Sequence, residues 1–267
     1  MRTSLTLICI VALGVVGCDD DTTSAGSSGA VTLKGAVNKG PLVTGSTVSV
    51  SIVDDVGNPT GAVYNTQTLS DLGEFSVSFD HRGLVALEGS GFYYNEALGA
   101  LSGANITLRA FYKVSADGTQ DAHINLVTHL SHNRVKTLLT QGTAFGQAVT
   151  QAESELRAAL QIGPVDFDPG AQGNQMNISG GDNAANAYLF ATSAIFAQAA
   201  IHRHSGGGSV DAHLQEIVNT YAIDLQADGL LDAAKVAEIT TAKLAINATD
   251  ITEKLEARLR AVGSDAA

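Results

Sequence analysis

Histidines gather on and beside the predicted helices, where imidazole side chains could bind a metal ion. His129 and His132 are three residues apart and share a helix face, His202 and His204 end another helix, and His123 precedes the first. Imidazole is a good ligand for zinc, copper or nickel. The spacing differs from the H-E-x-x-H signature, and no glutamate lies between His129 and His132. Packed and surface histidines explain the same pattern, so we predict no metal ligand and no cofactor.

Acidic residues form two groups that loosely resemble calcium-binding loops: Asp166 with Asp168, and Asp224 with Asp228 and Asp232. Calcium needs six or more converging oxygens, as in a D-x-D-x-D-G loop that ends in a glutamate. The spacing here is different and the final acid is missing. A turn between two helices, with Asp as N-cap, explains the second group as well.

Signals for nucleophilic catalysis or anion binding are weak. The chain has no G-x-S-x-G elbow. Asp182 follows two glycines before a predicted helix, and its own carboxylate would repel a phosphate there, so we expect it to be an N-cap. The run Tyr93-Tyr94-Asn95-Glu96 could supply an acid through Glu96, or it could be half-buried tyrosines beside a loop-ordering glutamate. We predict no catalytic residue.

Net charge and aromatic content limit the classes of partner. Asp and Glu number 27 against 15 Lys and Arg, a formal charge of −12, so nucleic-acid binding is not expected. The chain has no Trp and only 5% aromatic residues, which lowers the prospect of a sugar platform built on stacked rings without excluding one.

The N-terminus has the layout of an export signal. Arg2 is followed by an apolar run over residues 5–17. These 13 residues would span about 20 Å as a helix, less than the ~30 Å of a hydrocarbon core. We therefore predict a signal peptide over residues 1–17 rather than a transmembrane helix.

The end of this run contains the one residue that we assign to a specific modification. Val15-Val16-Gly17-Cys18 resembles the lipobox of bacterial lipoproteins, with Val15 where Leu is usual. The resemblance implies cleavage before Cys18 and lipid on its thiol, whereas an ordinary signal peptide with a chance cysteine is the alternative. Cys9 leaves with the signal, so the mature body has no free thiol. Asp19 resembles an inner-membrane retention signal of enteric bacteria.

The rest of the chain divides by hydrophobic period. Residues 18–30 are polar and acidic and predict a flexible tether. Residues 31–116 alternate apolar and polar side chains in short runs, which predicts a small antiparallel β-sandwich with strands near residues 31–33, 48–52, 75–79, 84–87 and 106–110.

Residues 121–263 have helical spacing and predict an all-α bundle of about six helices. Asp182, Ser209 and Asp250 are the expected N-caps, and Asp250 with Glu253 resembles a capping box. The expected fold class is α+β with two segregated domains, divided by the polar residues 115–121.

Two family resemblances support this architecture. The segment from Gly35 to Val50, followed by Asp71-Leu72-Gly73-Glu74-Phe75, resembles a carboxypeptidase-regulatory-like or transthyretin-like sandwich. Most of residues 35–240 resembles a group of uncharacterised bacterial lipoproteins in which a sandwich precedes a helical domain. This second resemblance favours an outer-membrane or cell-surface location, and it carries no catalytic residue over.

These patterns predict a lipid-anchored protein of the cell envelope that acts as a non-enzymatic binding or structural module. Its expected partners are the membrane, through the lipid, and an envelope protein or a polysaccharide. Two alternatives stay open: an envelope hydrolase or metal-dependent enzyme using the helical domain, and a calcium-dependent adhesion module.

Overall fold

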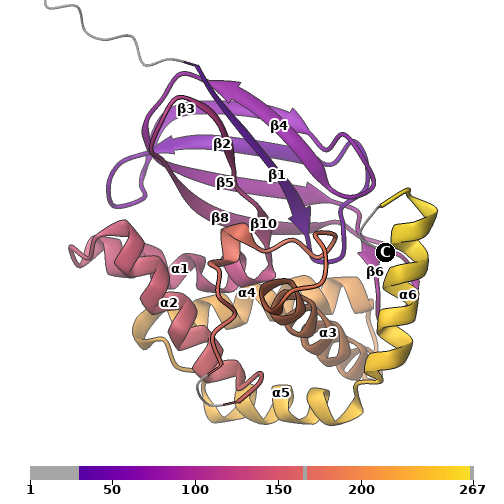
Figure 1. Cartoon of the computed structure of the whole chain (residues 1–267). Helices are drawn as coiled ribbons and strands as arrows, with labels where there is room; N and C mark the ends of the chain where they lie inside the picture. The colour runs from indigo at the N-terminus through magenta and orange to yellow at the C-terminus, as the bar shows by residue number, and fades with distance from the viewer. Residues whose placement is uncertain (1–29, 165–166, 265–267) are drawn as a thin grey trace, which may run out of the picture.

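The computed structural model describes residues 30–164 and 167–264. Strands come first along the chain and helices follow, so the fold is α+β with two segregated parts, as predicted (Figure 1). The predicted signal peptide, Cys18 and Asp19 lie outside the described residues.

Two sheets form the N-terminal part. In the first, β1 (Val31–Asn38) pairs antiparallel with β4 (Glu74–Phe79) and parallel with β9 (Gly118–Asp121) and β10 (Ile124–Asn125). In the second, all pairs are antiparallel and the order is β3 (Pro59–Gln67), β2 (Thr47–Val53), β5 (Gly83–Gly91) and β8 (Ile106–Val114). A short hairpin of β6 (Tyr94–Asn95) and β7 (Ala100–Leu101) follows β5.

Side-chain alternation explains most of these strands. Val48 and Val50 of β2 are buried with Leu87 and Leu108, whereas their neighbours in sequence point to the other face of the sheet. Every strand expected from this pattern is present. The sequence did not indicate β3, whose side chains are mostly exposed, or β9, which forms where the polar division between the two parts was expected.

Six α-helices make up the C-terminal part of the described chain, as predicted. They are α1 (Leu126–Thr140), α2 (Phe145–Leu160), α3 (Ala184–His204), α4 (Val210–Asp228), α5 (Ala233–Ala245) and α6 (Ala248–Ala261), with a short 3-10 turn, η1 (Gly173–Gln175), between α2 and α3.

The helix N-caps correct two expectations. Asn183, not Asp182, caps α3 by accepting a hydrogen bond from the Asn186 backbone, and Asn247, not Asp250, caps α6. Asp250 lies in the first turn of α6 instead, where its charge favours the helix dipole. Ser209 does occupy the N-cap of α4, but its side chain makes no capping hydrogen bond.

One hydrophobic core joins the two parts. Leu33, Leu87 and Leu108 of the sheets belong to the same cluster of buried side chains as Phe196 and Tyr221 of the helices. The helices therefore cover one side of the sandwich, as Figure 1 shows.

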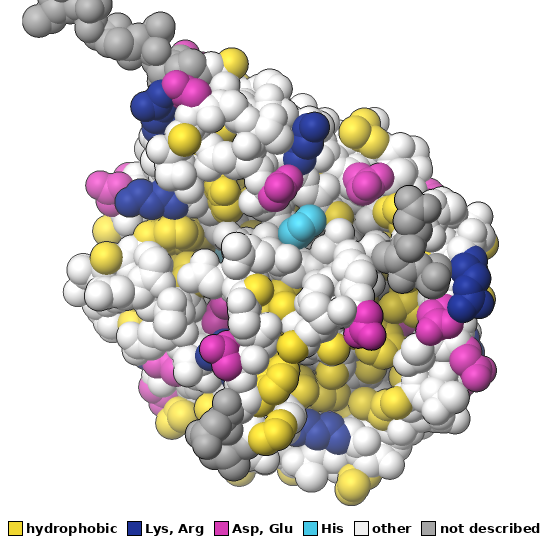
Figure 2. All heavy atoms as spheres, in the orientation of Figure 1, with side chains coloured by type: hydrophobic (Ala, Val, Ile, Leu, Met, Phe, Trp, Pro, Cys, Tyr) yellow, Lys and Arg dark blue, Asp and Glu magenta, His cyan; other side chains and the backbone are white. Residues whose placement is uncertain are grey.

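Helix α3 lies inside this core. Among the described helices it has the length and mean hydropathy to cross a membrane, yet 61% of that stretch is buried within the protein. Figure 2 shows acidic and basic side chains spread over this side of the molecule, while hydrophobic side chains gather over the helical part. Burial among the other helices accounts for the apolar character of α3.

Candidate binding cleft

The outer face of the four-stranded sheet is built from side chains that alternate with the core. Ser49, Glu88 and Arg109 share this face because Ser49 pairs with Glu88 and Glu88 pairs with Arg109 across β2, β5 and β8. The next positions along the same strands, Ser51, Ala86 and Phe111, are paired in the same way. The register thus brings residues that are far apart in sequence into single rows.

One end of this outer face is apolar and covered by helices. Val53, Leu84 and Phe111 pack there in a second hydrophobic cluster with side chains of α1 and α2, including Val135 and Leu138. This contact places the first two helices against the sheet. The other end of the face is polar and is left open.

A cleft of about 590 Å³ lies at that open end, between β8, α1 and α4. Its walls carry mainly amide, imidazole and hydroxyl groups, from Glu88, Asn105, Thr107, Arg109, His129, His132, Asn133, Gln215, Asn219, Ala222 and Ile223. Gln215 ties α4 to the rim of the sheet, because its Oε1 accepts a hydrogen bond from the Thr107 backbone N–H at 2.5 Å.

His129 is the central group of the cleft. Its side chain lines the cavity although the residue is only 4% exposed. Burial, with smaller contributions from the nearby His132 and Arg109, lowers the pKa of His129 to about 3, and a hydrogen-bonding contact with the Asn219 side chain acts in the opposite direction. At neutral pH the ring is therefore uncharged, with one donor and one acceptor nitrogen.

His132 forms the wall beside it. Its ring stacks on Phe111 with the centroids 4.2 Å apart and the planes 8° from parallel. Burial lowers the pKa of His132 to about 4, so this imidazole is also neutral near pH 7. The remaining charges in the cleft compensate each other, because Arg109 Nε donates to Glu88 Oε2 at 2.9 Å.

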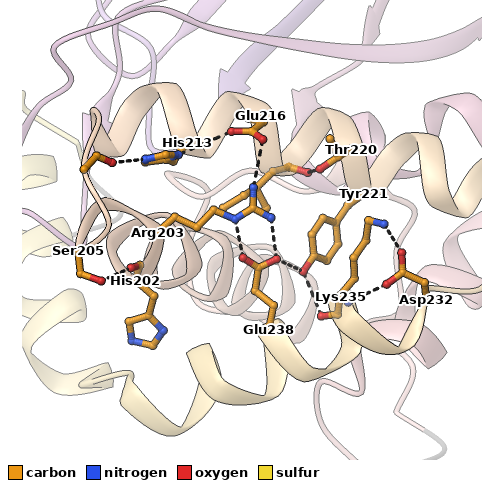
Figure 3. Close-up of polar contacts among 12 residues, drawn as sticks. His202, Arg203, Ser205, His213, Glu216, Thr220, Tyr221, Asp232, Lys235 and Glu238 are labelled. Atoms are coloured by element: carbon orange, nitrogen blue, oxygen red, sulfur yellow. Dashed lines mark hydrogen bonds and ion pairs between the residues drawn. The ribbon is translucent and has the colours of Figure 1, made fainter.

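The histidines that could have formed a metal site do not come together. His129 and His132 share the cleft, but His202 and His204 lie at the end of α3, and Figure 3 shows His202 beside the polar network of α3, α4 and α5. His123 Nδ1 instead accepts a hydrogen bond from the Ala36 backbone at 2.9 Å. Within residues 30–164 and 167–264, no three His, Cys, Asp or Glu side chains are grouped so that they could hold a metal ion.

The second acidic group surrounds a lysine. Lys235 Nζ lies 2.5 Å from Asp232 and 3.4 Å from Asp224, and Asp232 also caps α5 through the Lys235 backbone N–H. Asp228 accepts a hydrogen bond from the Leu230 backbone in the turn. The ammonium group of Lys235 thus pairs with two of these three carboxylates. Of the first group, Asp168 orders a turn at Gly170, and Asp166 lies outside the described residues.

Helices α3, α4 and α5 are held together by the polar network shown in Figure 3. Arg203 of α3 makes two hydrogen bonds to Glu238 of α5, at 2.6 and 2.9 Å, and Tyr221 of α4 donates to Glu238 at 2.7 Å. Burial and the adjacent Glu238 both raise the pKa of Tyr221. Each polar group is satisfied within the network, so we interpret it as structural.

The run from Tyr93 to Glu96 is buried between the two parts rather than open to a ligand. Tyr93 donates to Asp211 of α4 at 2.6 Å, and Glu96 forms an ion pair with Lys39 at 2.6 Å with both side chains fully buried. Ser193 Oγ of α3 also lies 2.6 Å from Glu96 Oε1. This part of the chain lines none of the cavities described here, and it fastens the hairpin to the helices.

Comparison with known protein families, curated proteins and solved structures finds no match for this chain. The interpretation of the cleft therefore depends on its own residues.

Several of those residues were not foreseen. Alternation at residues 106–110 does put Thr107 and Arg109 on the polar face, and the sequence shows that His129 and His132 share a helix face. Gln215 and Asn219, however, come from a helix about a hundred positions later. Their helix has polar side chains on many positions, so nothing in the sequence marks these two as neighbours of His129.

The buried histidines predict a loss of stability in acid. Unfolding returns His129 to an ordinary pKa near 6.5, so its contribution is complete above pH 6.5 and is lost as the pH falls towards 3. Lowering the pH from 7 to 5 should cost about 2 kcal/mol through this residue. Urea unfolding at pH 7 and pH 5 measures this loss. We expect the loss of stability between the two pH values to be smaller for His129→Gln than for the wild type, by about 2 kcal/mol. The same substitution at His204, at the end of α3, is the control, and equal losses for His129→Gln and the wild type would contradict the assignment.

Proposed function

We propose that this protein is a non-enzymatic binding module that holds a neutral, hydroxyl-rich ligand in the cleft between β8, α1 and α4. The observation that carries the proposal is the polar lining of this cavity, in which the amides of Asn105 and Asn219 surround His129, a buried and uncharged imidazole. A ligand hydroxyl can serve as both donor and acceptor, which matches amide groups that carry both.

The rest of the cleft suits the same ligand class. Arg109 and Glu88 neutralise each other, so the cavity has no net charge to attract an ion. The amides of Asn105 and Asn219 supply further donors and acceptors, whereas the Gln215 amide is hydrogen bonded to Thr107 and Asn219. Ile223, which is 62% exposed at the rim, offers an apolar surface to the carbon skeleton of the ligand.

Binding is favoured over hydrolysis by the number of carboxylates. Glycosidases generally use two carboxylates that face each other across the bond to be cleaved. Glu88 is the single carboxylate in the lining of this cleft, and it is held by Arg109. Among the described residues, no serine hydroxyl is hydrogen bonded to an imidazole ring that could activate it. These features support a binding site in preference to the envelope-hydrolase alternative.

A matched pair of variants tests the cleft. Arg109→Met removes a cleft donor. Arg82→Met removes an arginine with the same 49% side-chain exposure, whose ion pair with Asp117 does not line the cleft. The probes are methyl glycosides of glucose, galactose, mannose and N-acetylglucosamine, followed by NMR of the 15N-labelled protein. We expect dissociation constants on the order of 1 mM for the wild type and Arg82→Met, and at least tenfold weaker binding for Arg109→Met.

The imidazole has a test of its own. His129→Phe keeps an aromatic ring in the cleft but removes the nitrogens that contact Asn219, and we expect it to weaken the glycoside response while the remaining amide resonances keep their positions. Absence of binding by all four glycosides to the wild type, or equal binding by Arg109→Met and Arg82→Met, would overturn the proposal.

We also propose that the module acts at the cell envelope, anchored by lipid on Cys18. The support is the sequence pattern of an apolar run, a lipobox-like end and an acidic polar segment. A stable anchor of this kind needs more than one acyl chain, since a single chain gives only reversible binding.

Cys18→Ala gives the prediction for this anchor. Cells fed a palmitate analogue should label the wild type, whereas the variant should carry no label and should leave the membrane fraction because its thiol is gone. Cys9→Ala, within the predicted signal peptide, is the control and should keep the label. A labelled Cys18→Ala protein would refute the anchor.

A further inference from the structure

Three hollows on the outer face of the sheet adjoin one another. The cleft shares Glu88 with a second hollow of about 700 Å³ over β2, β3 and β5, and it shares Glu88, Arg109 and His132 with a third of about 310 Å³. Ser49 lines both the second and the third. The cleft is therefore one end of a longer groove.

The register of the sheet shows which way this groove runs. Asn65 pairs with Ser49, Ser49 with Glu88 and Glu88 with Arg109, which makes one row of side chains across β3, β2, β5 and β8. A parallel row beside it contains Gln67, Thr47, Ser90 and Thr107. Each row crosses three strand spacings, roughly 14 Å, before it reaches His129.

The rows carry hydroxyl and amide groups, with one internally compensated ion pair between Glu88 and Arg109. Among the described residues, no hydrogen bond engages the side-chain amides of Asn65 or Gln67, at the end of the rows distant from His129. Leu69, which is 66% exposed, borders the second hollow as Ile223 borders the cleft, so each end has an apolar surface.

From this geometry we infer that the ligand is a linear, neutral polysaccharide whose chain lies across the strands, with one end in the His129 cleft. The inference rests on the proposed function and extends it from one cavity to the whole row. A polymer is indicated because the hydroxyl and amide lining continues well beyond the cleft in one direction.

An extended peptide fits this groove less well. Peptides that join a sheet run along its edge and pair with free backbone groups. Here the groove crosses the strands instead of following an edge. β2 and β5 are paired on both sides, and at the β8 edge Gln215 occupies both the N–H and the carbonyl of Thr107. Along its length the groove thus offers mainly side chains, which suits a ligand with hydroxyl groups along its chain.

Chain length is the variable that tests the inference. We would titrate the full-length mature protein with linear gluco- and chito-oligosaccharides of one to six units by calorimetry. We expect the affinity for the better series to rise at least tenfold between the monosaccharide and the hexasaccharide. Asn65→Ala/Gln67→Ala should lose this gain while keeping monosaccharide binding, because both residues are distant from His129.

Thr32→Ala/Ser78→Ala is the matched control. These two side chains form a polar cross-strand pair on the other sheet, with their hydroxyl oxygens 2.9 Å apart, so their loss should leave the length dependence intact. Monosaccharide binding without length dependence would overturn this inference and leave the proposed function standing. Absence of any saccharide binding would overturn both, and tighter binding of a Gly-Ser peptide of equal length would replace the polysaccharide with a peptide.

Discussion

Lys39→Met is expected to lower the free energy of unfolding by about 3–5 kcal/mol. Lys39 and Glu96 are both fully buried, and Lys39 Nζ lies 2.6 Å from Glu96 Oε1. Removing the ammonium group leaves a carboxylate in the interior with Ser193 as its nearest donor, and Glu96 Oε2 already has no partner among the described residues. The loss therefore comes mainly from an uncompensated buried charge. Urea unfolding at pH 7 measures it.

The double variant Lys39→Met/Glu96→Gln separates charge from packing. With both charges gone, a large part of the lost stability should return, since neutral side chains of similar volume fill the same space. Arg82→Met is the control for an ion pair at the surface and should be close to the wild type, because exposed pairs are screened by water. A single variant as stable as the wild type, or a double variant less stable than Lys39→Met, would contradict this account.

The position of Lys39 also shows what the sequence could not provide. Lys39-Gly40-Pro41 is typical of an exposed turn, and nothing local indicates that the lysine is enclosed by a hairpin and by α3. Gly40 allows the enclosure, because a Cβ there would lie 1.9 Å from the Tyr94 carbonyl oxygen. Burial of this kind depends on contacts 57 and 154 positions away, which are set by tertiary packing.

Periodicity did predict the architecture, because burial of one strand face or one helix face leaves a regular trace in the sequence. The strands near residues 48–52 and 106–110 and the long helices follow from it. β3 leaves no such trace, since it contributes mostly polar and small side chains to a solvent-facing edge. The groove could not be predicted from the sequence either. Its rows of side chains are made by register, which is a property of strand pairs rather than of any one strand.

Glu153→Gln is expected to make the protein more stable than the wild type at pH 8, and to change stability little at pH 5. Glu153 of α2 is buried, and burial raises its pKa to about 7 from 4.5, while a hydrogen bond from the Gly173 backbone N–H at 3.0 Å opposes the shift. The folded state thus binds this proton more tightly than the unfolded state. The contribution of protonated Glu153 to the free energy of unfolding is complete below pH 4.5 and is lost as the pH rises through about 7.

The shift corresponds to about 3 kcal/mol, so this is the expected gain of the glutamine variant above pH 7. Glutamine keeps a carbonyl oxygen that can accept from Gly173, and Gly173 in turn accepts from Asn125, the N-cap of α1, so the local structure should persist.

Urea unfolding at half-unit steps from pH 5 to pH 8 gives the measurement, with the exposed Glu253→Gln of α6 as the control that follows the wild type. His129 acts in the opposite direction below pH 6.5, so the difference between each variant and the wild type isolates one group at a time. Parallel profiles for Glu153→Gln and the wild type would mean that this carboxyl group is ionised in the folded protein throughout the range, and that the contact with Gly173 is strong enough to offset its burial.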